Sequence, residues 1–239
     1  MAIREQIVEY RDGETLLEGF FCYDDSYAGP QPAVMLSHAW GGRDEFIERK
    51  ARRLAWHGYA AFGLDMYGKS KRGTTQEECQ ALMAPFVQDR ALLARRINAA
   101  LTTVKGLSQV DPRRVAAMGF CFGGMCVLDL ARSGADLRGV ISFHGLLKPN
   151  GLPRTGKIRA RILMMHGYDD PLAPPEDVLA IAKEFTEAGA DWQLHAYGHT
   201  VHSFTNPAAN NRAGGMQYND VADRRSWHTL LQFLDEVLR

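Results

Sequence analysis

Hydrophobic positions in this 239-residue chain form short apolar runs that alternate with amphipathic stretches. Two runs near the N-terminus, 3–8 and 16–23, flank Arg11-Asp12-Gly13, a pattern that is typical of a β-hairpin with an Asp-Gly turn. The later apolar runs are too short for helices, so they predict buried strands. These predicted strands lie at 33–36, 59–64, 114–118, 139–143, 161–165 and 192–197.

The stretches between the runs carry apolar residues at helical spacing. They predict helices at 44–57, 76–104 with a break near Pro85, 124–132, 176–188 and 221–238. A hairpin followed by strand–helix alternation predicts one α/β domain over residues 1–239, with a mostly parallel central sheet that helices cover on both faces. Ligands bind such sheets beyond the carboxyl ends of the strands, so polar residues that follow strands are the candidates for chemistry.

Composition narrows the class of protein. The 28 basic and 28 acidic side chains give a formal net charge of zero. The protein therefore has no excess positive charge that would attract nucleic acid. It also has little net charge to prevent weak self-association. No apolar run approaches the roughly 18 residues of a membrane span, and the opening MAIREQIVEY lacks the apolar centre of a secretory signal. The four cysteines form no C-x-x-C pair. We therefore expect a reduced, cytoplasmic protein, monomeric or weakly dimeric, without nucleic-acid or membrane partners.

The segment Gly119-Phe120-Cys121-Phe122-Gly123 is a G-x-S-x-G pattern with cysteine in place of serine. It lies between a predicted strand and a predicted helix, the setting that a nucleophile on a sharp turn requires. The thiol would then project from the sheet at the N-terminus of a helix, where the helix dipole favours the thiolate form. The Phe122 N–H would be in position to bind an oxyanion. The alternative is a small buried cysteine at a strand–helix junction. Cys126, farther along the predicted helix, is expected in the core.

A cysteine nucleophile needs a base, and the base needs a group that orients it. In hydrolases with this turn, the acid and then the histidine follow the nucleophile along the chain. The segment after the strand at 161–165 contains Asp169 and Asp170, and we predict that Asp170 orients the base, with Asp169 as the alternative. The alternative interpretation of this Pro/Asp-rich segment is a loop without a catalytic role. His202, after the strand at 192–197, is the predicted base.

A metal site is the alternative use of the same histidines. His195, His199 and His202 form an H-x3-H-x2-H pattern, but no acidic or cysteine ligand stands beside them in the sequence. His195 also falls inside a predicted strand, whereas His199 is expected on the loop surface. We therefore predict no metal and no cofactor.

Three segments together resemble the dienelactone hydrolase family of α/β-hydrolases. They are GFCFGG at 119–124, HGYDDPLAPP at 166–175 and GHTVHSF at 198–204, and the cysteine in the first is the specific part. The resemblance implies an α/β-hydrolase fold and a triad of Cys121, His202 and Asp170. It also implies a second oxyanion donor in the segment 37–42 after the first long strand, which here is the Ala39 N–H.

Two positions depart from the family pattern. Members that cleave dienelactones carry a glutamate where this chain has His38, and an arginine that binds the substrate carboxylate where it has Asn206. The family has a second arginine after the next strand, and in this chain Lys69 or Arg72 lies near that position. His38 has two open interpretations, a hydrogen bond to Cys121 that favours thiolate, or a structural histidine. The predicted pocket rim is otherwise aromatic and uncharged: Trp40, Tyr67, Phe143 and Tyr168.

These features predict a cysteine-dependent hydrolase of small neutral carboxylic esters or lactones, with neutral aryl phosphotriesters as secondary substrates. The first alternative is a true dienelactone (carboxymethylenebutenolide) hydrolase. Alternatives from other classes are a thiol redox sensor or small-molecule binder on the same fold, and a peptidase or acyl-transferase with the same triad.

Overall fold

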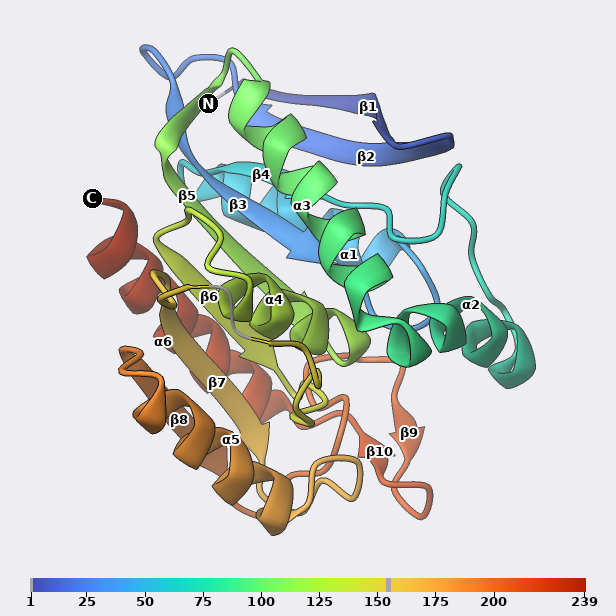
Figure 1. Ribbon diagram of the computed structural model, residues 1–239. Coiled ribbons are helices and arrows are strands. Elements are labelled where there is room, and N and C mark those ends of the chain that lie inside the picture. Colours follow the sequence, from blue (N-terminus) through green and yellow to red (C-terminus); the bar gives the residue numbers. More distant parts are fainter. Residues whose placement is uncertain (1, 154–155) are drawn as a thin grey trace.

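An eight-stranded sheet forms the centre of the computed structural model, which describes residues 2–153 and 156–239 (Figure 1). Its strand order is β1-β2-β4-β3-β5-β6-β7-β8. The strands are β1 (Ile3–Asp12), β2 (Thr15–Asp24), β3 (Gln31–Ser37), β4 (Ala60–Gly63), β5 (Val110–Phe120), β6 (Gly139–Phe143), β7 (Arg161–Gly167) and β8 (Trp192–Tyr197). The β1–β2 and β2–β4 pairs are antiparallel and the other pairs are parallel, which confirms the predicted mostly parallel sheet with an N-terminal hairpin.

Helices cover both faces of this sheet. They are α1 (Glu45–Trp56), α2 (Gln76–Gln88), α3 (Arg90–Gly106), α4 (Phe122–Arg132), α5 (Pro175–Glu187) and α6 (Asp220–Leu238). In Figure 1, α1 and α6 lie behind the sheet and α3, α4 and α5 lie in front, and each side has its own cluster of buried apolar side chains. No helix among the described residues combines the length and the apolar character needed to cross a membrane.

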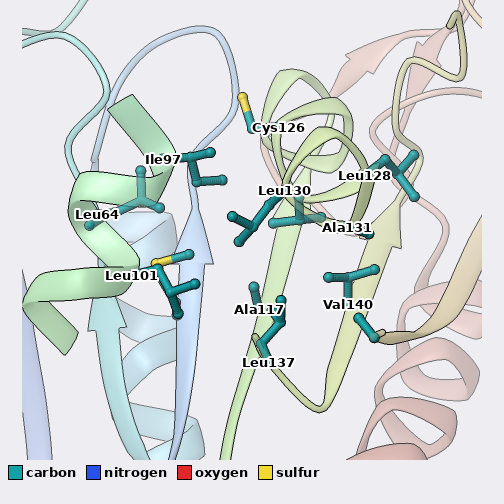
Figure 2. Close-up of a cluster of buried hydrophobic side chains, with 14 of the residues drawn as sticks. Leu64, Ile97, Leu101, Ala117, Cys126, Leu128, Leu130, Ala131, Leu137 and Val140 are labelled. Atoms are coloured by element: carbon teal, nitrogen blue, oxygen red, sulfur yellow. The ribbon is translucent and has the colours of Figure 1, made fainter. Parts of the chain in front are cut away.

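The front face shows why these helices dock here. Figure 2 shows Ile97 of α3 and Leu130 of α4 directed at the sheet, where the small side chain of Ala117 on β5 lets both helices approach closely. All three residues are fully buried. Burying a leucine or isoleucine side chain contributes roughly 1.5–3 kcal/mol, so this cluster is a main source of stability.

Two local features differ from the sequence prediction. The helix break lies at Asp89 and not at Pro85: Pro85 stays inside α2, while the Asp89 side chain accepts from Leu92 N and caps α3. A capping carboxylate satisfies an otherwise orphaned backbone N–H, which favours a new helix start at that residue. A two-stranded hairpin, β9 (Asn210–Asn211) and β10 (Met216–Gln217), was not predicted because its polar sequence carries no alternating pattern.

Three glycines allow strand β5, helix α4 and their neighbours to touch through their backbones. A Cβ on Gly119 would lie 2.0 Å from Gly123 O, and one on Gly123 would lie 2.2 Å from Ser37 O. A Cβ on Gly124 would lie 2.6 Å from the Ser142 hydroxyl. The start of α4 therefore rests directly on the ends of β5, β3 and β6, and no larger residue fits at these positions.

We expect Gly119→Ala to lower the free energy of unfolding by about 3 kcal/mol or more, because backbone atoms cannot move aside for the new methyl group. The melting temperature should fall by about 6–12 °C. Gly106→Ala at the end of α3 is the matched control, since its Cβ would meet no atom within 4 Å and alanine favours helix, so its melting temperature should not fall. Equal melting temperatures for both variants in a thermal denaturation experiment would contradict the argument.

Candidate active site

Cys121 occupies the single residue between β5 and α4. Its backbone has φ 56 and ψ −117, a conformation that L-residues rarely adopt and that costs about 1–3 kcal/mol. Its amide donates to Phe143 O at 3.1 Å, which ties the turn to the neighbouring strand β6. Cys121 is partly exposed, whereas Cys22, Cys79 and Cys126 are buried. The one accessible thiol of the four thus lies at the N-terminus of a helix.

His202 and Asp170 form a buried hydrogen-bonded pair. His202 Nδ1 lies 2.7 Å from Asp170 Oδ2, and both side chains are at most 1% exposed. The second carboxylate oxygen of Asp170 accepts from Leu172 N at 2.8 Å, which fixes the orientation of the carboxylate. Asp169 is exposed, and its backbone amide bonds Thr200 O. Of the two adjacent aspartates, Asp170 therefore contacts the histidine.

The unpredicted hairpin β9–β10 holds the backbone of His202. His202 N donates to Gly215 O at 2.9 Å, and His202 O accepts from Gln217 N at 3.1 Å. Gly215 has φ 78, and a Cβ there would lie 2.3 Å from the Pro171 ring, so the hairpin also rests on the residue after Asp170. The hairpin thereby braces both members of the buried pair.

The charge state of His202 depends on its two neighbours. Burial opposes the charged form, but the negative Cys121 thiolate and the Asp170 carboxylate outweigh it and raise the pKa of His202 to about 10. Nε2, the other ring nitrogen, is buried and makes no well-formed hydrogen bond to a described residue. Catalytic hydrogen bonds are often long in a ligand-free site, so Nε2 remains available to Cys121 and to a substrate.

The backbone N–H groups of Phe122, which follows Cys121, and of Ala39, which follows β3, have no acceptor among the described residues. Phe122 begins α4, where the first N–H groups of a helix lack intrahelical partners. Gly123 packs against the carbonyls of Ser37 and His38, which brings the end of β3 to the start of α4. Two free donors near a nucleophile can together bind a developing oxyanion.

His38 does not need the thiol as a partner. Its Nδ1–H donates to Ala39 O at 2.6 Å, and its Nε2 accepts from Met66 N at 3.2 Å. Arg96 of α3 holds the Met66 carbonyl at 2.7 Å, so the histidine is braced from a distant element. Burial lowers the pKa of His38, which suits a neutral ring with one donor and one acceptor. The geometry supports the structural interpretation of His38.

The residues predicted for the pocket rim differ in exposure. Trp40 is partly buried, the Tyr67 hydroxyl donates to Trp40 O at 2.8 Å, and Tyr168 is 60% exposed. Phe143 is not on the rim: it is 1% exposed and stacks on Phe120 in the core cluster beneath α1 and α6. Its position near the end of a strand suggested the rim, but its side chain points to the rear face of the sheet.

Of the positions at or near the family arginines, Asn206 carries no charge, Arg72 is paired and Lys69 is exposed. Arg72 lies 3.5 Å from Glu48, and Asn206 Oδ1 accepts from Ala208 N at 3.0 Å in a local turn. Sequence reasoning missed Leu82 and Met83 of α2, which are partly buried against the same front-face cluster as Trp40 and Cys121. Both residues fall within the helix predicted at 76–104, but their position depends on how α2 docks.

The three histidines of the H-x3-H-x2-H pattern do not converge. His199 is exposed with φ 57, and His195 lies 3.2 Å from the Gln193 side chain on β8. Within residues 2–153 and 156–239, no group of three His, Cys, Asp or Glu side chains has metal-binding geometry.

Comparison with known proteins identifies the family. The model of the dienelactone hydrolase family matches residues 17–238. The chain belongs to the dienelactone hydrolase family. It shares 36% identity and a TM-score of 0.96, over the full length of both chains, with the metagenomic dienelactone hydrolase-like promiscuous phosphotriesterase P91. A structure named m3DLH matches over the full length of both chains with 37% identity and a TM-score of 0.95.

Sequence relatives extend the comparison. An uncharacterised protein of Caenorhabditis elegans is 38% identical over 61% of this chain and 94% of its own length. The protein usf of Aquifex pyrophilus is 24% identical over 98% of this chain and 99% of its own. The fold is that of α/β-hydrolases, as predicted, and the protein is a dienelactone hydrolase-like hydrolase.

We expect the imidazole of His202 to stay protonated in wild type as the pH rises from 6 to 8, because its pKa lies at about 10. In Cys121→Ala the pKa should fall by about one unit or more, since the thiolate no longer favours the charged ring. Proton–nitrogen correlation spectra of the histidine rings recorded against pH measure both values, with exposed His199 as internal reference. Loss of the His202 proton near neutral pH in wild type would contradict this assignment.

Proposed function

We propose that this protein hydrolyses small neutral carboxylic esters or lactones, with Cys121 as nucleophile, His202 as general acid and base, and Asp170 as the residue that orients His202. The observation that carries the proposal is the buried His202–Asp170 hydrogen bond of 2.7 Å behind the partly exposed Cys121. A nucleophile, a base and an orienting carboxylate in this order are the requirements of covalent acyl transfer.

In the first half-reaction the Cys121 thiolate attacks the carbonyl carbon and the C=O electron pair moves onto oxygen. The tetrahedral intermediate then expels the alkoxide or aryl oxide as its C–O bond breaks. His202, protonated at the start, gives its proton to the leaving oxygen, so an alcohol departs and a thioester remains on Cys121. Asp170 keeps the ring in one tautomer while its charge changes.

In the second half-reaction neutral His202 removes a proton from water while the hydroxyl attacks the thioester. The C–S bond breaks, the carboxylic acid leaves, and Cys121 returns to thiolate beside protonated His202. No cofactor is needed in either half-reaction. The unpaired N–H groups of Phe122 and Ala39 would bind both oxyanions, and each such donor contributes roughly 3 kcal/mol to catalysis.

The replacement of the family's carboxylate-binding arginine by an uncharged residue supports neutral substrates over anionic lactones. Asn206 stands where dienelactone-cleaving relatives carry a carboxylate-binding arginine, and Arg72 is engaged by Glu48. A charge-assisted hydrogen bond contributes about 1.5–3 kcal/mol, so its loss would weaken binding of an anionic dienelactone by roughly ten- to a hundredfold. True dienelactone hydrolysis is therefore the second candidate.

The similarity to P91 bears on a secondary activity. That protein is described as a promiscuous phosphotriesterase, and this chain matches it at 36% identity over the full length. In a neutral aryl phosphotriester the thiolate would attack phosphorus, the P–O bond to the aryl oxide would break, and the phosphoryl oxygen would occupy the oxyanion site. The resulting thiophosphoryl enzyme would be hydrolysed like the thioester.

The rival interpretations have less support. A redox sensor or binder has no use for a buried histidine braced by a carboxylate and a hairpin. An acyl-transferase would use the same acyl-enzyme and differ only in the group that accepts the acyl chain.

We expect wild type to hydrolyse p-nitrophenyl acetate and Cys121→Ala to lose at least about a thousandfold in kcat/KM, because no other group supplies the nucleophile. Cys22→Ala is the control: Cys22 is a buried thiol on β2, outside the site, and its replacement should leave kcat/KM unchanged. Release of p-nitrophenol is followed by absorbance. Equal rates for wild type and Cys121→Ala would refute the enzyme mechanism.

We expect wild type also to release p-nitrophenol from diethyl p-nitrophenyl phosphate, with a lower kcat/KM than for the ester. The rate should depend on Cys121, since the same thiolate attacks phosphorus. Cys121→Ala and Cys22→Ala again serve as a pair. Turnover of the ester without detectable turnover of the phosphotriester would remove the secondary activity and leave the esterase proposal intact.

A further inference from the structure

A second buried histidine touches His202, and the mechanism above does not use it. His144 directly follows β6 and is 2% exposed. Its ring centroid lies 5.0 Å from that of His202, at an interplanar angle of 68°, so the two rings meet edge to face. Its Nε2 lies 2.9 Å from the hydroxyl of Thr205, which is itself fully buried in the segment after His202.

The backbone of His144 indicates that its position is under constraint. It has φ 39, in the left-handed region that glycine adopts more readily, and its amide is fixed by Met165 O at 2.8 Å. A non-glycine residue in such a conformation costs about 1–3 kcal/mol and persists where the surroundings hold it, often at functional sites. The ring of His144 is thus directed at His202 at an energetic cost.

His144 meets His202 as a neutral ring. Burial, followed by the positive charge of His202, keeps the pKa of His144 well below its ordinary value, and Lys50 of α1 acts in the same direction. Three titratable groups are near His202. Cys121 lies at the β5–α4 junction, and His166 and Asp170 lie at and just after the end of β7. His166 also has a lowered pKa, through burial. His202 is therefore the cation between two neutral imidazoles.

We propose that His144 is a positioning residue whose neutral ring stabilises the protonated form of His202 and, through it, the thiolate of Cys121. A neutral aromatic ring attracts a cation that lies over its face within about 6 Å of its centroid, and the edge-to-face contact at 5.0 Å is compatible with this arrangement. The attraction grows where water is excluded. The inference deepens the proposed function, because it assumes that Cys121 and His202 form the reacting pair.

The competing explanation gives His144 a purely structural part. Its ring fills space between β6 and the segment after His202, and its bond to Thr205 anchors that segment. Both explanations expect a less stable protein after substitution. Only the electrostatic role expects a change in the pH at which the Cys121 thiolate forms, because removal of the ring disfavours the ion pair and shifts that pH upward.

The test is the rate of Cys121 alkylation by iodoacetamide between pH 4 and pH 9, measured on full-length protein by mass spectrometry. The variants are His144→Asn, which tolerates the left-handed backbone and removes the ring, and His144→Phe, which keeps a ring but loses the Thr205 bond. Thr205→Val removes that bond and leaves His144 in place. Cys121→Ala gives the background from the buried cysteines, and melting temperatures verify that each variant is folded.

We expect the pH of half-maximal alkylation in His144→Asn to rise by about one unit, equivalent to roughly tenfold slower alkylation on the acid side. In His144→Phe and Thr205→Val it should stay within about 0.3 units of wild type, because the ring is retained. The proposal is overturned if His144→Asn matches wild type, or if either ring-containing variant shifts as far as His144→Asn. If His144→Asn does not fold, His144→Phe still tests the proposal. A rise of one unit in its pH of half-maximal alkylation would overturn the proposal.

Alkylation does not depend on turnover, so the two proposals can fail separately. A wild-type protein that hydrolyses neither ester nor phosphotriester removes the proposed function and leaves the His144 comparison measurable. Normal hydrolysis with coincident alkylation profiles in wild type and His144→Asn removes only the role of His144.

Discussion

Direct backbone contact between β5, α4 and β3 is the constraint on which the site depends. Gly119 and Gly123 leave no room for a Cβ, so the helix begins immediately where the strand ends and Cys121 must adopt a left-handed conformation. The same contact lays the start of α4 against the end of β3, beside the free N–H groups of Phe122 and Ala39. The proposed nucleophile and the proposed oxyanion donors therefore share one origin, which is the close approach of these three backbones.

The proposed base, His202, is positioned by a separate set of hydrogen bonds. His202 lies in the segment after β8, and irregular segments are ordinarily more mobile than the elements they join. Hydrogen bonds to Gly215 and Gln217 on one side and to Asp170 on the other remove that freedom. Figure 1 shows the β9–β10 hairpin and α2 at the same end of the sheet, where polar residues follow the ends of the parallel strands. A general base works only within hydrogen-bond reach of its proton, so this bracing is a requirement of the chemistry.

Sequence patterns predicted those features that depend on near neighbours in the chain. The glycines on either side of Cys121 indicated it as the candidate nucleophile. Its distance along the chain from Asp170 and His202 is consistent with complete strand–helix units between these residues. Features that depend on which elements become neighbours were out of reach. The tautomer of His38 depends on Met66 N, the contact of His144 with His202 depends on β6 pairing with β7, and a fully buried strand does not reveal which face Phe143 joins. The hairpin β9–β10 has no periodic signal in the sequence, and its hydrogen bonds to the backbone of His202 depend on the folded chain.

Three buried histidines near the site differ in charge because their partners differ. His38 has a backbone carbonyl on one nitrogen and a backbone N–H on the other, a pair that only a neutral ring can satisfy. His144 has a hydroxyl on one side and a cationic ring beside it, so burial prevails and it too stays neutral. His202 alone faces two negative groups, and these reverse the effect of burial. Isolating a single cation among neutral imidazoles prevents the repulsion that several charged rings would produce in a dry interior. The charge that Cys121 needs beside it is therefore selected by the whole arrangement of donors, acceptors and carboxylate, and not by His202 alone.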